Sequence, residues 1–316
     1  MSGKHLGPQI VPADAAGIAA AAARIVVGEA VAVPTETVYG LAARADSPHA
    51  VAAIYAAKGR PGFNPLIVHV PDLASAEAIA IFDNRARQLA AEFWPGPLTL
   101  VLPLREDARI APAVTAGLPT IALRSPAHPV MRAVLEASGL PLAAPSANRS
   151  GGVSPTSAQH VARSLAGRIA MVLDGGDCPA GLESTIVALR ADGTWQQLRP
   201  GPVNHEDLVE ALGGESEAHD ERGIEAPGQL ASHYAPGKPV RLTVSAADPD
   251  EFLIGFGPLA GDYNLSPGGD LAEAAARLYA ALHEAAAAPQ PRIAVAAVPE
   301  HGLGAALNDR LRRAAA

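Results

Sequence analysis

The chain has 316 residues, 49% of them hydrophobic, which is enough for one large or two ordinary domains with a sizeable core. Its formal net charge is −8 and it has no run of lysine or arginine, which argues against a broad face for stable nucleic-acid binding. Cys178 is the single cysteine, so the chain forms no intrachain disulfide and no cysteine-based zinc site. We expect a soluble, cytoplasmic protein, because no signal pattern and no apolar run of membrane-spanning length is present.

Apolar periodicity and turn residues predict strands and helices that alternate along the chain. The predicted strands are residues 29–33, 65–70, 98–104, 119–124, 140–144, 169–173, 183–189, 195–198, 240–244, 252–255 and 292–298. The predicted helices are residues 14–28, 49–57, 72–82, 84–93, 128–138, 157–165, 204–212, 270–287 and 303–316. Many of these strands are almost entirely apolar, as in sheets covered on both faces, so the pattern indicates an α/β fold.

An acidic, glycine-containing stretch without apolar periodicity, residues 213–226, is the best candidate for a domain boundary. We therefore expect a first domain at residues 1–212, a linker at 213–239 and a small C-terminal α/β domain at 240–316. A polar connection of this length is usually disordered or functional, and we expect it to close over the ligand site as a lid. A flexible tether is the alternative interpretation.

Polar residues follow several predicted strands, at the position where open α/β sheets bind their ligands. Residues 34–40 (PTETVYG) follow the first strand, and Lys58 and Arg60 come at the end of the helix after it. Residues 145–156 (PSANRSGGVSPT) link a buried strand to a helix, and backbone N–H groups in such a loop suit a phosphate. Taken singly, each feature has a structural explanation, since a helix dipole favours cations at its C-terminal end and small polar residues form loops.

Six segments in this order resemble the YrdC/YciO family over roughly residues 10–212. They are residues 34–40, Lys58 and Arg60 with 64–65, Arg124 with 128–129, 145–148 with 154–156, 183–185, and 198–201. Residues 233–236 (HYAP), 302–304 and 308–311 are similar to the linker and C-terminal signatures of the long, two-domain form of that family. Six ordered motifs are far more specific than any one of them.

The resemblance implies a YrdC-like twisted mixed sheet with flanking helices and a basic concave face, followed by a small Rossmann-like α/β domain. It also implies an enzyme that forms threonylcarbamoyl-AMP and pyrophosphate from L-threonine, bicarbonate and ATP. Mg²⁺ would accompany the ATP phosphates, with no dedicated metal ligand on the protein. The product would pass to a tRNA threonylcarbamoyl transferase for the threonylcarbamoyladenosine modification of tRNA.

The same resemblance assigns roles to individual residues. Lys58 and Arg60 are the expected catalytic residues. The expected ATP-binding residues are Lys58, Arg60, Asn64, Thr120, Ser146, Asn148, Ser154, Arg199 and Tyr234. The expected threonine-binding residues are Thr35, Thr37, His69, Arg124, Ala144 and Ser184. The chemistry agrees, because cations and N–H groups neutralise phosphates and a guanidinium matches a carboxylate with two parallel hydrogen bonds.

Two alternatives stay open at this point. The first is a non-catalytic RNA-binding module, since small proteins with this core are regarded as RNA binders, although the negative net charge argues against it. The second is a carbamoyltransferase-type domain, because the same core occurs in a hydrogenase-maturation protein. That protein carries additional cysteine-rich zinc modules, which a chain with one cysteine lacks.

Overall fold

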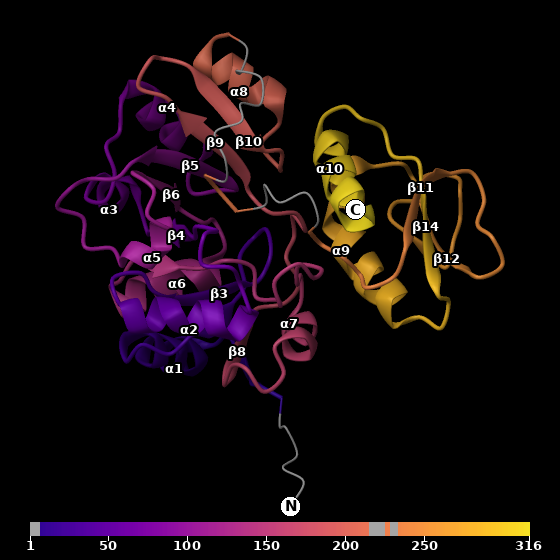
Figure 1. Ribbon diagram of the computed structural model, residues 1–316, viewed down its shortest axis with the longest axis horizontal. Helices are drawn as coiled ribbons and strands as arrows, with labels where there is room; N and C mark the ends of the chain where they lie inside the picture. The colour runs from indigo at the N-terminus through magenta and orange to yellow at the C-terminus, as the bar shows by residue number, and fades with distance from the viewer. Residues whose placement is uncertain (1–6, 215–224, 228–232) are drawn as a thin grey trace, which may run out of the picture.

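The structure is a computed structural model that describes residues 7–214, 225–227 and 233–316. These residues form a ten-stranded sheet and a four-stranded sheet, each with its own helices (Figure 1). The mixed α/β fold expected from the sequence is confirmed. The exact domain bounds, 1–212, 213–239 and 240–316, stay a prediction.

The large sheet is mixed, with the strand order β1-β8-β2-β3-β7-β4-β6-β5-β9-β10. Its strands are β1 Gln9–Pro12, β2 Val31–Val33, β3 Gly40–Arg44, β4 Ile67–His69, β5 Leu98–Pro103, β6 Thr120–Arg124, β7 Leu142–Ala143, β8 Met171–Asp174, β9 Thr185–Leu189 and β10 Trp195–Arg199. Parallel pairing of β4 with β6 sets His69 opposite Arg124, so two predicted site residues share one edge of the sheet. Parallel β5 and β9 and antiparallel β10 complete that end.

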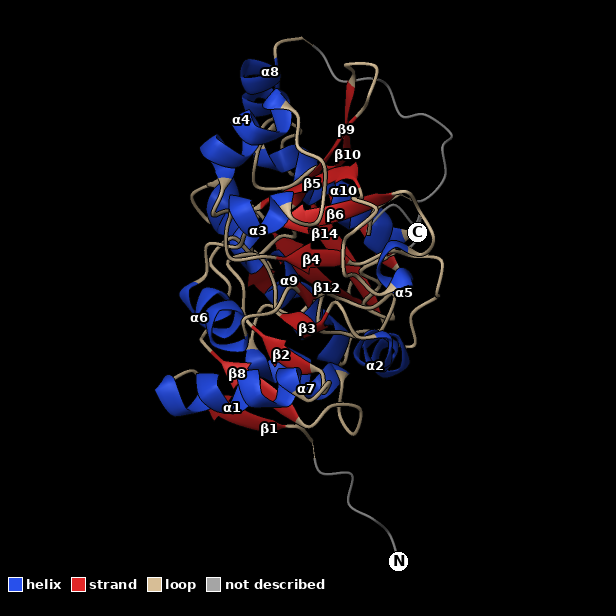
Figure 2. Cartoon of the chain, turned by 90° about the vertical axis from the view of Figure 1, so that its left-hand side faces the viewer, coloured by secondary structure: helices blue, strands red, loops and turns tan. Residues whose placement is uncertain are grey.

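Helices lie on both sides of the large sheet, as Figure 2 shows. They are α1 Ala15–Val26, α2 Pro48–Lys58, α3 Leu73–Glu77, α4 Asn84–Phe93, α5 Pro112–Thr115, α6 Pro129–Ser138, α7 Ala158–Ser164 and α8 His205–Leu212. The side chain of Asp14 caps α1 and that of Ser47 caps α2, and both are residue types favoured at this position. Since α1 packs against α6 and α2 against β3, apolar cores form on the two faces of the sheet.

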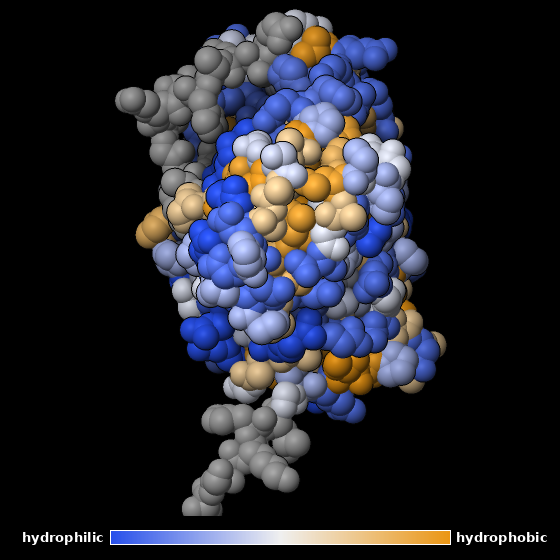
Figure 3. Space-filling view, turned by 90° about the vertical axis from the view of Figure 1, so that its right-hand side faces the viewer, coloured by the Kyte–Doolittle hydropathy of each residue, from blue (hydrophilic) through white to orange (hydrophobic). Residues whose placement is uncertain are grey.

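The second sheet is parallel throughout, with the order β11-β14-β12-β13. Its strands are β11 Val240–Val244, β12 Glu251–Gly255, β13 Tyr263–Asn264 and β14 Arg292–Ala296. Helices α9 Leu271–Ala287 and α10 Leu303–Ala315 lie between this sheet and the large one (Figure 1). Figure 3 views the molecule from the side of this smaller sheet and shows an apolar patch surrounded by hydrophilic residues.

One hydrophobic core joins the two parts of the molecule. Val38, Val153 and Leu182 of the larger part pack in the same buried cluster as Tyr279 of α9 and Leu307 of α10. Burying apolar surface stabilises a contact by about 25 cal/mol per Å², so this shared core fixes the helices of the smaller part against the larger one. None of the helices in the described part of the chain has the length and apolar character that crossing a membrane requires.

The sequence prediction missed two strands of the large sheet and extended one helix too far. Strand β3 begins at Gly40, where an added Cβ would lie 3.2 Å from the Ala144 Cβ, so a close strand contact explains this glycine. Helix α3 ends at Glu77, although residues 78–82 continue an apolar pattern. Ala80 instead pairs with Leu104 beyond β5, because a tertiary contact overrides the local helix preference. Strand β1, at the sheet edge, is the other missed strand.

Candidate active site

A small cavity lies where the ends of β4 and β6 meet the turn after β2, the loop after β7 and the described ends of the linker. Its free volume is about 50 Å³. The residues expected from the motifs that line this cavity are Thr35, Thr37, Arg60, His69, Arg124, Ala144, Ser146, Ser184, Arg199 and Tyr234. Segments far apart in the sequence therefore meet at one place.

The guanidinium of Arg124, at the end of β6, is oriented by three neighbours. Nη1 donates to Thr37 Oγ1 at 2.9 Å, Nη2 to Glu36 Oε1 at 2.5 Å and Nε to Gly96 O at 3.1 Å. Burial by itself would raise the pKa of Glu36, but Arg124 lowers it to about 2, so this buried pair is ionised at neutral pH. Each terminal nitrogen carries a second N–H, and this pair of donors suits a carboxylate.

The turn after β2 holds the two threonines that flank Glu36. Thr35 Oγ1 lies 2.8 Å from Thr37 Oγ1, and it donates to Val38 O at 2.6 Å. The N–H groups of Thr37 and Val38 both donate back to Thr35 Oγ1 at 3.2 Å. A hydroxyl that bonds the backbone in this way stabilises a turn. Thr35 is thus a turn former, and the same turn carries Thr37 to Arg124.

Two buried histidines line the cavity with a ring nitrogen that has no hydrogen-bond partner among the described residues. These atoms are His69 Nδ1, at the end of β4, and His233 Nδ1, in the linker. Burial lowers both pKa values to about 3, and Arg124 adds to the effect at His69, so both rings are neutral at neutral pH. Buried polar atoms are normally satisfied, so these nitrogens indicate that a ligand completes the site.

Arg199, at the end of β10, is tied to the strand beside it. Nε donates to Ser184 O at 3.0 Å, and Nη2 donates to Ser184 Oγ at 3.1 Å. The hydroxyl of Ser184 also lies 2.7 Å from Thr99 Oγ1. Nη1 donates to Pro227 O, in the linker, at 3.3 Å. A buried guanidinium with most contacts to neutral oxygens keeps a positive charge available at the cavity wall.

Lys58 is 3% exposed, and it contacts the loop after β7 from the side that faces away from the cavity lining. Its Nζ donates to Ser146 O at 2.5 Å and to Asn148 O at 2.7 Å. The loop has internal bonds as well, from Ser146 Oγ to Asn148 Oδ1 at 2.6 Å and from Asn148 Nδ2 to Gly152 O at 2.7 Å. Burial, and then Arg60, lower the pKa of the Lys58 ammonium. Ser146 lines the cavity, whereas Lys58 and Asn148 support it from outside the lining.

Arg60 and Asn64 form a second supporting contact. Arg60 Nη2 donates to Asn64 Oδ1 at 2.6 Å and to Pro65 O at 2.8 Å, and of these residues Arg60 lines the cavity. Thr120 is the first residue of β6, four residues before Arg124, which corresponds to about 13 Å along a strand. A nucleotide would therefore have to extend well beyond the small cavity to contact Thr120.

The described ends of the linker lie against the site. Tyr234 is 1% exposed and has a φ of 65°, a left-handed conformation that is strained for a bulky residue. The next residue, Ala235, donates its N–H to Gly151 O at 2.8 Å, in the loop after β7. The lid expected at 213–239 falls partly on residues 215–224 and 228–232, which lie outside the described residues. Its closure stays a prediction.

Sequence reasoning assigned no role to two carboxylates at the site. Glu36 pairs with Arg124, and Glu183 lines the cavity between Ser154 and the C-terminal helices. Both lie inside motifs that the sequence had singled out, but a carboxylate in a site for anionic ligands looks unfavourable until its arginine partner is known. Ser154 lies behind the cavity wall, with its hydroxyl 2.6 Å from Glu183.

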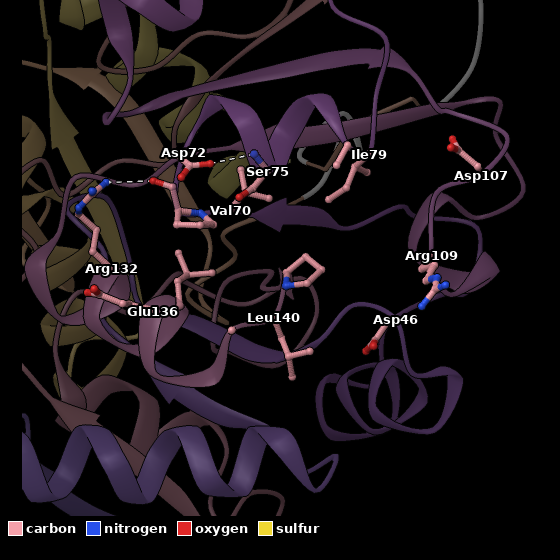
Figure 4. A pocket seen from close by; sticks show the side chains of 15 residues that line it. Asp46, Val70, Asp72, Ser75, Ile79, Asp107, Arg109, Arg132, Glu136 and Leu140 are labelled. Carbon is pink, nitrogen blue, oxygen red and sulfur yellow. Dashed lines mark hydrogen bonds between the residues drawn. The ribbon is translucent and has the colours of Figure 1, made fainter.

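A larger open cavity, of about 920 Å³, lies elsewhere on the large sheet (Figure 4). Figure 4 shows acidic and basic side chains spread around open space, with Arg132 donating to Pro71 O at 3.3 Å and Asp72 accepting from the Ser75 N–H at 2.8 Å. The residues expected from the motifs line the small cavity and not this one. Convergent, buried polar groups mark a binding site better than volume does, so the small cavity is the candidate active site.

The fold and this cavity define the class of protein: the chain belongs to the Sua5_yciO_yrdC family. That family's model, described as telomere recombination, matches residues 24–201, and a second model, described as threonylcarbamoyl-AMP synthase, C-terminal domain, matches residues 203–316. The family expected from the sequence motifs, in its long two-domain form, is therefore confirmed.

Individual relatives match over nearly the whole chain. The threonylcarbamoyl-AMP synthase of Bacillus subtilis (strain 168) is 41% identical over 325 residues, which cover 94% of this chain and 92% of the relative. The threonylcarbamoyl-AMP synthase of Pyrococcus abyssi (strain GE5 / Orsay) is 39% identical over 313 residues, with coverages of 91% and 90%. The crystal structure of P. abyssi Sua5 complexed with L-threonine superposes with a TM-score of 0.89 at 36% identity, covering 97% of both chains.

Proposed function

We propose that this enzyme is an L-threonylcarbamoyladenylate synthase. As a nucleotidyltransferase, it would form threonylcarbamoyl-AMP and pyrophosphate from L-threonine, bicarbonate and ATP. The observation that carries the proposal is the convergence of Arg124, Arg199 and neutral His69 on one buried cavity. The names of full-length relatives, and the L-threonine complex of one of them, support it.

Threonine would bind at the Arg124 end of the cavity. The second N–H group on each terminal nitrogen of the guanidinium would hold the substrate carboxylate, while Glu36 and Thr37 fix the orientation of the guanidinium. The unpartnered Nδ1 of His69 and the hydroxyl of Ser184, which also lines the cavity, are the groups that would orient the substrate's amine and hydroxyl. Ala144 would contribute a small apolar wall that leaves room for the side chain.

ATP would bind on the side of Arg60, Arg199 and Ser146. The amine of threonine attacks the carbon of bicarbonate and water leaves, and an oxygen of the resulting carbamate then attacks the α-phosphorus of ATP, from which pyrophosphate departs. Such a reaction needs positioned substrates and neutralised charge and no nucleophile from the protein. The buried arginines supply that charge in an environment where few waters screen it.

Magnesium would arrive as part of the nucleotide substrate. Within the described residues, no three histidine, cysteine, aspartate or glutamate side chains are grouped as metal ligands. Mg²⁺ commonly binds through phosphate oxygens and water with few protein ligands, so the donors present fit a metal that ATP carries. The threonylcarbamoyl-adenylate would then pass to a tRNA threonylcarbamoyl transferase, and we propose that the reaction takes place in the cytoplasm.

The test is incubation of the protein with MgATP, L-threonine and labelled bicarbonate. A labelled adenylate, with matching pyrophosphate release, should form only when all three substrates are present. Pyrophosphate release that is equal without threonine would refute the synthase. Retention of RNA on a filter without ATP dependence would indicate the RNA-binding alternative, and label transfer without any threonine requirement would indicate the carbamoyltransferase alternative.

A further inference from the structure

Glu183 is a buried carboxylate at which the cavity meets the C-terminal part of the chain. Its Oε1 accepts a hydrogen bond from Ser154 Oγ at 2.6 Å. Its Oε2 accepts from Tyr279 OH, in α9, at 2.7 Å and from Arg310 Nε, in α10, at 2.9 Å. Two of its three partners therefore belong to the C-terminal helices, outside the six segments at residues 34–201 that contain most of the expected site residues.

Arg310 contacts several parts of the site at once. It is fully buried, with 0% of its surface exposed. Besides Glu183, Nη2 donates to Pro200 O, just after β10, at 2.9 Å, and Nη1 donates to Asp309 Oδ2 at 2.7 Å. The guanidinium also lies 5.5 Å from the centre of the Tyr234 ring, in the linker. One side chain of α10 thus touches both strand ends that carry Glu183 and Arg199, together with the linker.

The contacts continue from Glu183 into the cavity. Glu183 lines the cavity itself, and the next residue, Ser184, is held to Arg199 through both its carbonyl and its hydroxyl. A shift of the Glu183 side chain would release Ser154 on one side and move the backbone of Ser184 on the other. A displacement of about 1 Å in a catalytic constellation can cost roughly a hundredfold in rate.

We propose that Tyr279 and Arg310 are positioning residues of the active site. They hold Glu183, and through it Ser154, Ser184 and Arg199, in the arrangement that the substrates require. The proposal rests on the proposed function for its kinetic readout. It also assigns the C-terminal helices a direct part in completing the site.

The electrostatics of this cluster agree with the geometry. Burial alone would raise the pKa of Glu183, but Arg310, then Arg199, and the hydrogen bonds from Ser154 and Tyr279 lower it to about 2. The other ionisable groups that face this carboxylate are Lys58, His233 and Tyr234. With Arg310 replaced by a neutral residue, the main attraction is lost while burial remains, so the pKa of Glu183 rises. Catalysis would then weaken as the pH falls and the carboxylate takes up a proton.

The experiment compares Tyr279→Phe, Arg310→Lys and Arg310→Met in the full chain. Tyr279→Phe removes one hydroxyl and keeps the ring, and we expect kcat/KM for ATP to fall about tenfold, mainly through KM, which corresponds to about 1.4 kcal/mol. Arg310→Met should add an acid limb to the pH profile of kcat/KM that the unaltered enzyme lacks. Arg310→Lys keeps the positive charge, so its pH profile should lack the acid limb that Arg310→Met shows. A positioning role predicts this rescue by the conservative variant.

The chain offers matched controls within its own C-terminal part. Arg277 pairs with Glu273 at 2.9 Å and lies 5.0 Å from the centre of the Tyr263 ring. Like Arg310, it therefore has a carboxylate and an aromatic partner, but its side chain is more exposed to solvent. Arg277→Lys and Tyr263→Phe should leave both KM values and the pH profile unchanged. A purely structural role for Arg310 and Tyr279 would lower the amount of folded enzyme and hence kcat, with KM and the pH profile unaltered, and that result would overturn the proposal.

Binding measurements separate this proposal from the proposed reaction. Calorimetric titration with MgATP and with L-threonine needs no turnover and is performed on every variant, with thermal melting as the check on folding. Weaker MgATP binding by folded Tyr279→Phe, about tenfold, supports the positioning role even if the unaltered enzyme forms no adenylate. Unchanged MgATP binding by folded Tyr279→Phe and folded Arg310→Met refutes it, even if the synthase reaction is found.

Discussion

The replacement Arg124→Lys tests the assignment of the threonine carboxylate site. In the structure, the guanidinium uses one N–H on each of three nitrogens for Gly96, Thr37 and Glu36, and it keeps a second N–H on each terminal nitrogen. A lysine ammonium is a single point charge and cannot present two parallel N–H donors to a carboxylate. The positive charge beside Glu36 remains, so the buried carboxylate is still balanced and the fold should persist.

The size of the effect follows from the contacts that are lost. A hydrogen bond between charged groups contributes about 1.5–3 kcal/mol, so losing one of the two bonds to the carboxylate should raise KM for L-threonine about ten- to hundredfold. ATP contacts Arg60 and Arg199 in our assignment, so KM for ATP should change by no more than about twofold.

The assay is pyrophosphate release at saturating bicarbonate, with L-threonine and ATP varied in turn. Arg132→Lys is the control, because Arg132 is a partly buried arginine whose Nη1 donates to Pro71 O in the larger cavity, away from the motif residues. This control should keep both KM values. A rise in KM for ATP with threonine unaffected would show that Arg124 binds the nucleotide and that the orientation of the substrates is reversed.

Three further predictions follow. Lys58→Ala and Arg60→Ala should each lower kcat/KM about ten- to hundredfold. Lys58→Ala should also lower the melting temperature, because the Lys58 ammonium donates to two loop carbonyls. A loss of kcat/KM below about twofold in both variants would contradict a role in catalysis. Tyr234→Ala should weaken activity, and MgATP with L-threonine should protect the linker from proteolysis in the unaltered protein; unchanged kinetics and cleavage would leave a simple tether. The free energy of unfolding should fall on acidification, because the pKa of Glu183 drops from 4.5 to about 2 and that of His69 from 6.5 to about 3 on folding. The His69 effect begins below about pH 6.5 and the Glu183 contribution is lost below about pH 4.5, so equal urea stability at pH 7 and pH 3.5 would contradict both.

Local patterns were sufficient to predict many of the elements, because helix caps and apolar runs act over short distances. Asp14 and Ser47 cap two of the helices that the sequence predicted, and the apolar strand that ends at Arg124 lies where its composition indicated. The prediction was wrong where a distant partner decides the conformation. Residues after Glu77 leave the helix because Ala80 pairs with a segment beyond β5, which no local signal reports.

The candidate site shows the same division between local chemistry and tertiary contacts. The motifs indicated which side chains to examine, and the structure brings most of them to one cavity while it places Lys58 and Ser154 behind its wall and Thr120 at the far end of β6. Periodicity could not reveal that Lys58 bonds loop carbonyls, because that contact joins residues about ninety positions apart. A His–Tyr pair in a polar linker is more often exposed than buried, so composition alone could not indicate that this segment packs against the cavity. His233 and Tyr234 are buried here.

By itself, then, the amino-acid sequence determined the α/β class, the order of most elements and the family, because these depend on local patterning and on motifs that occur in a set order. Only the tertiary structure decided which charges are paired. Glu183 has no partner within its own motif, and the hydroxyl of Tyr279 and the guanidinium of Arg310 reach it from helices 96 and 127 residues away. A buried carboxylate keeps its charge only where such partners converge in three dimensions, and a linear pattern carries no information about that convergence.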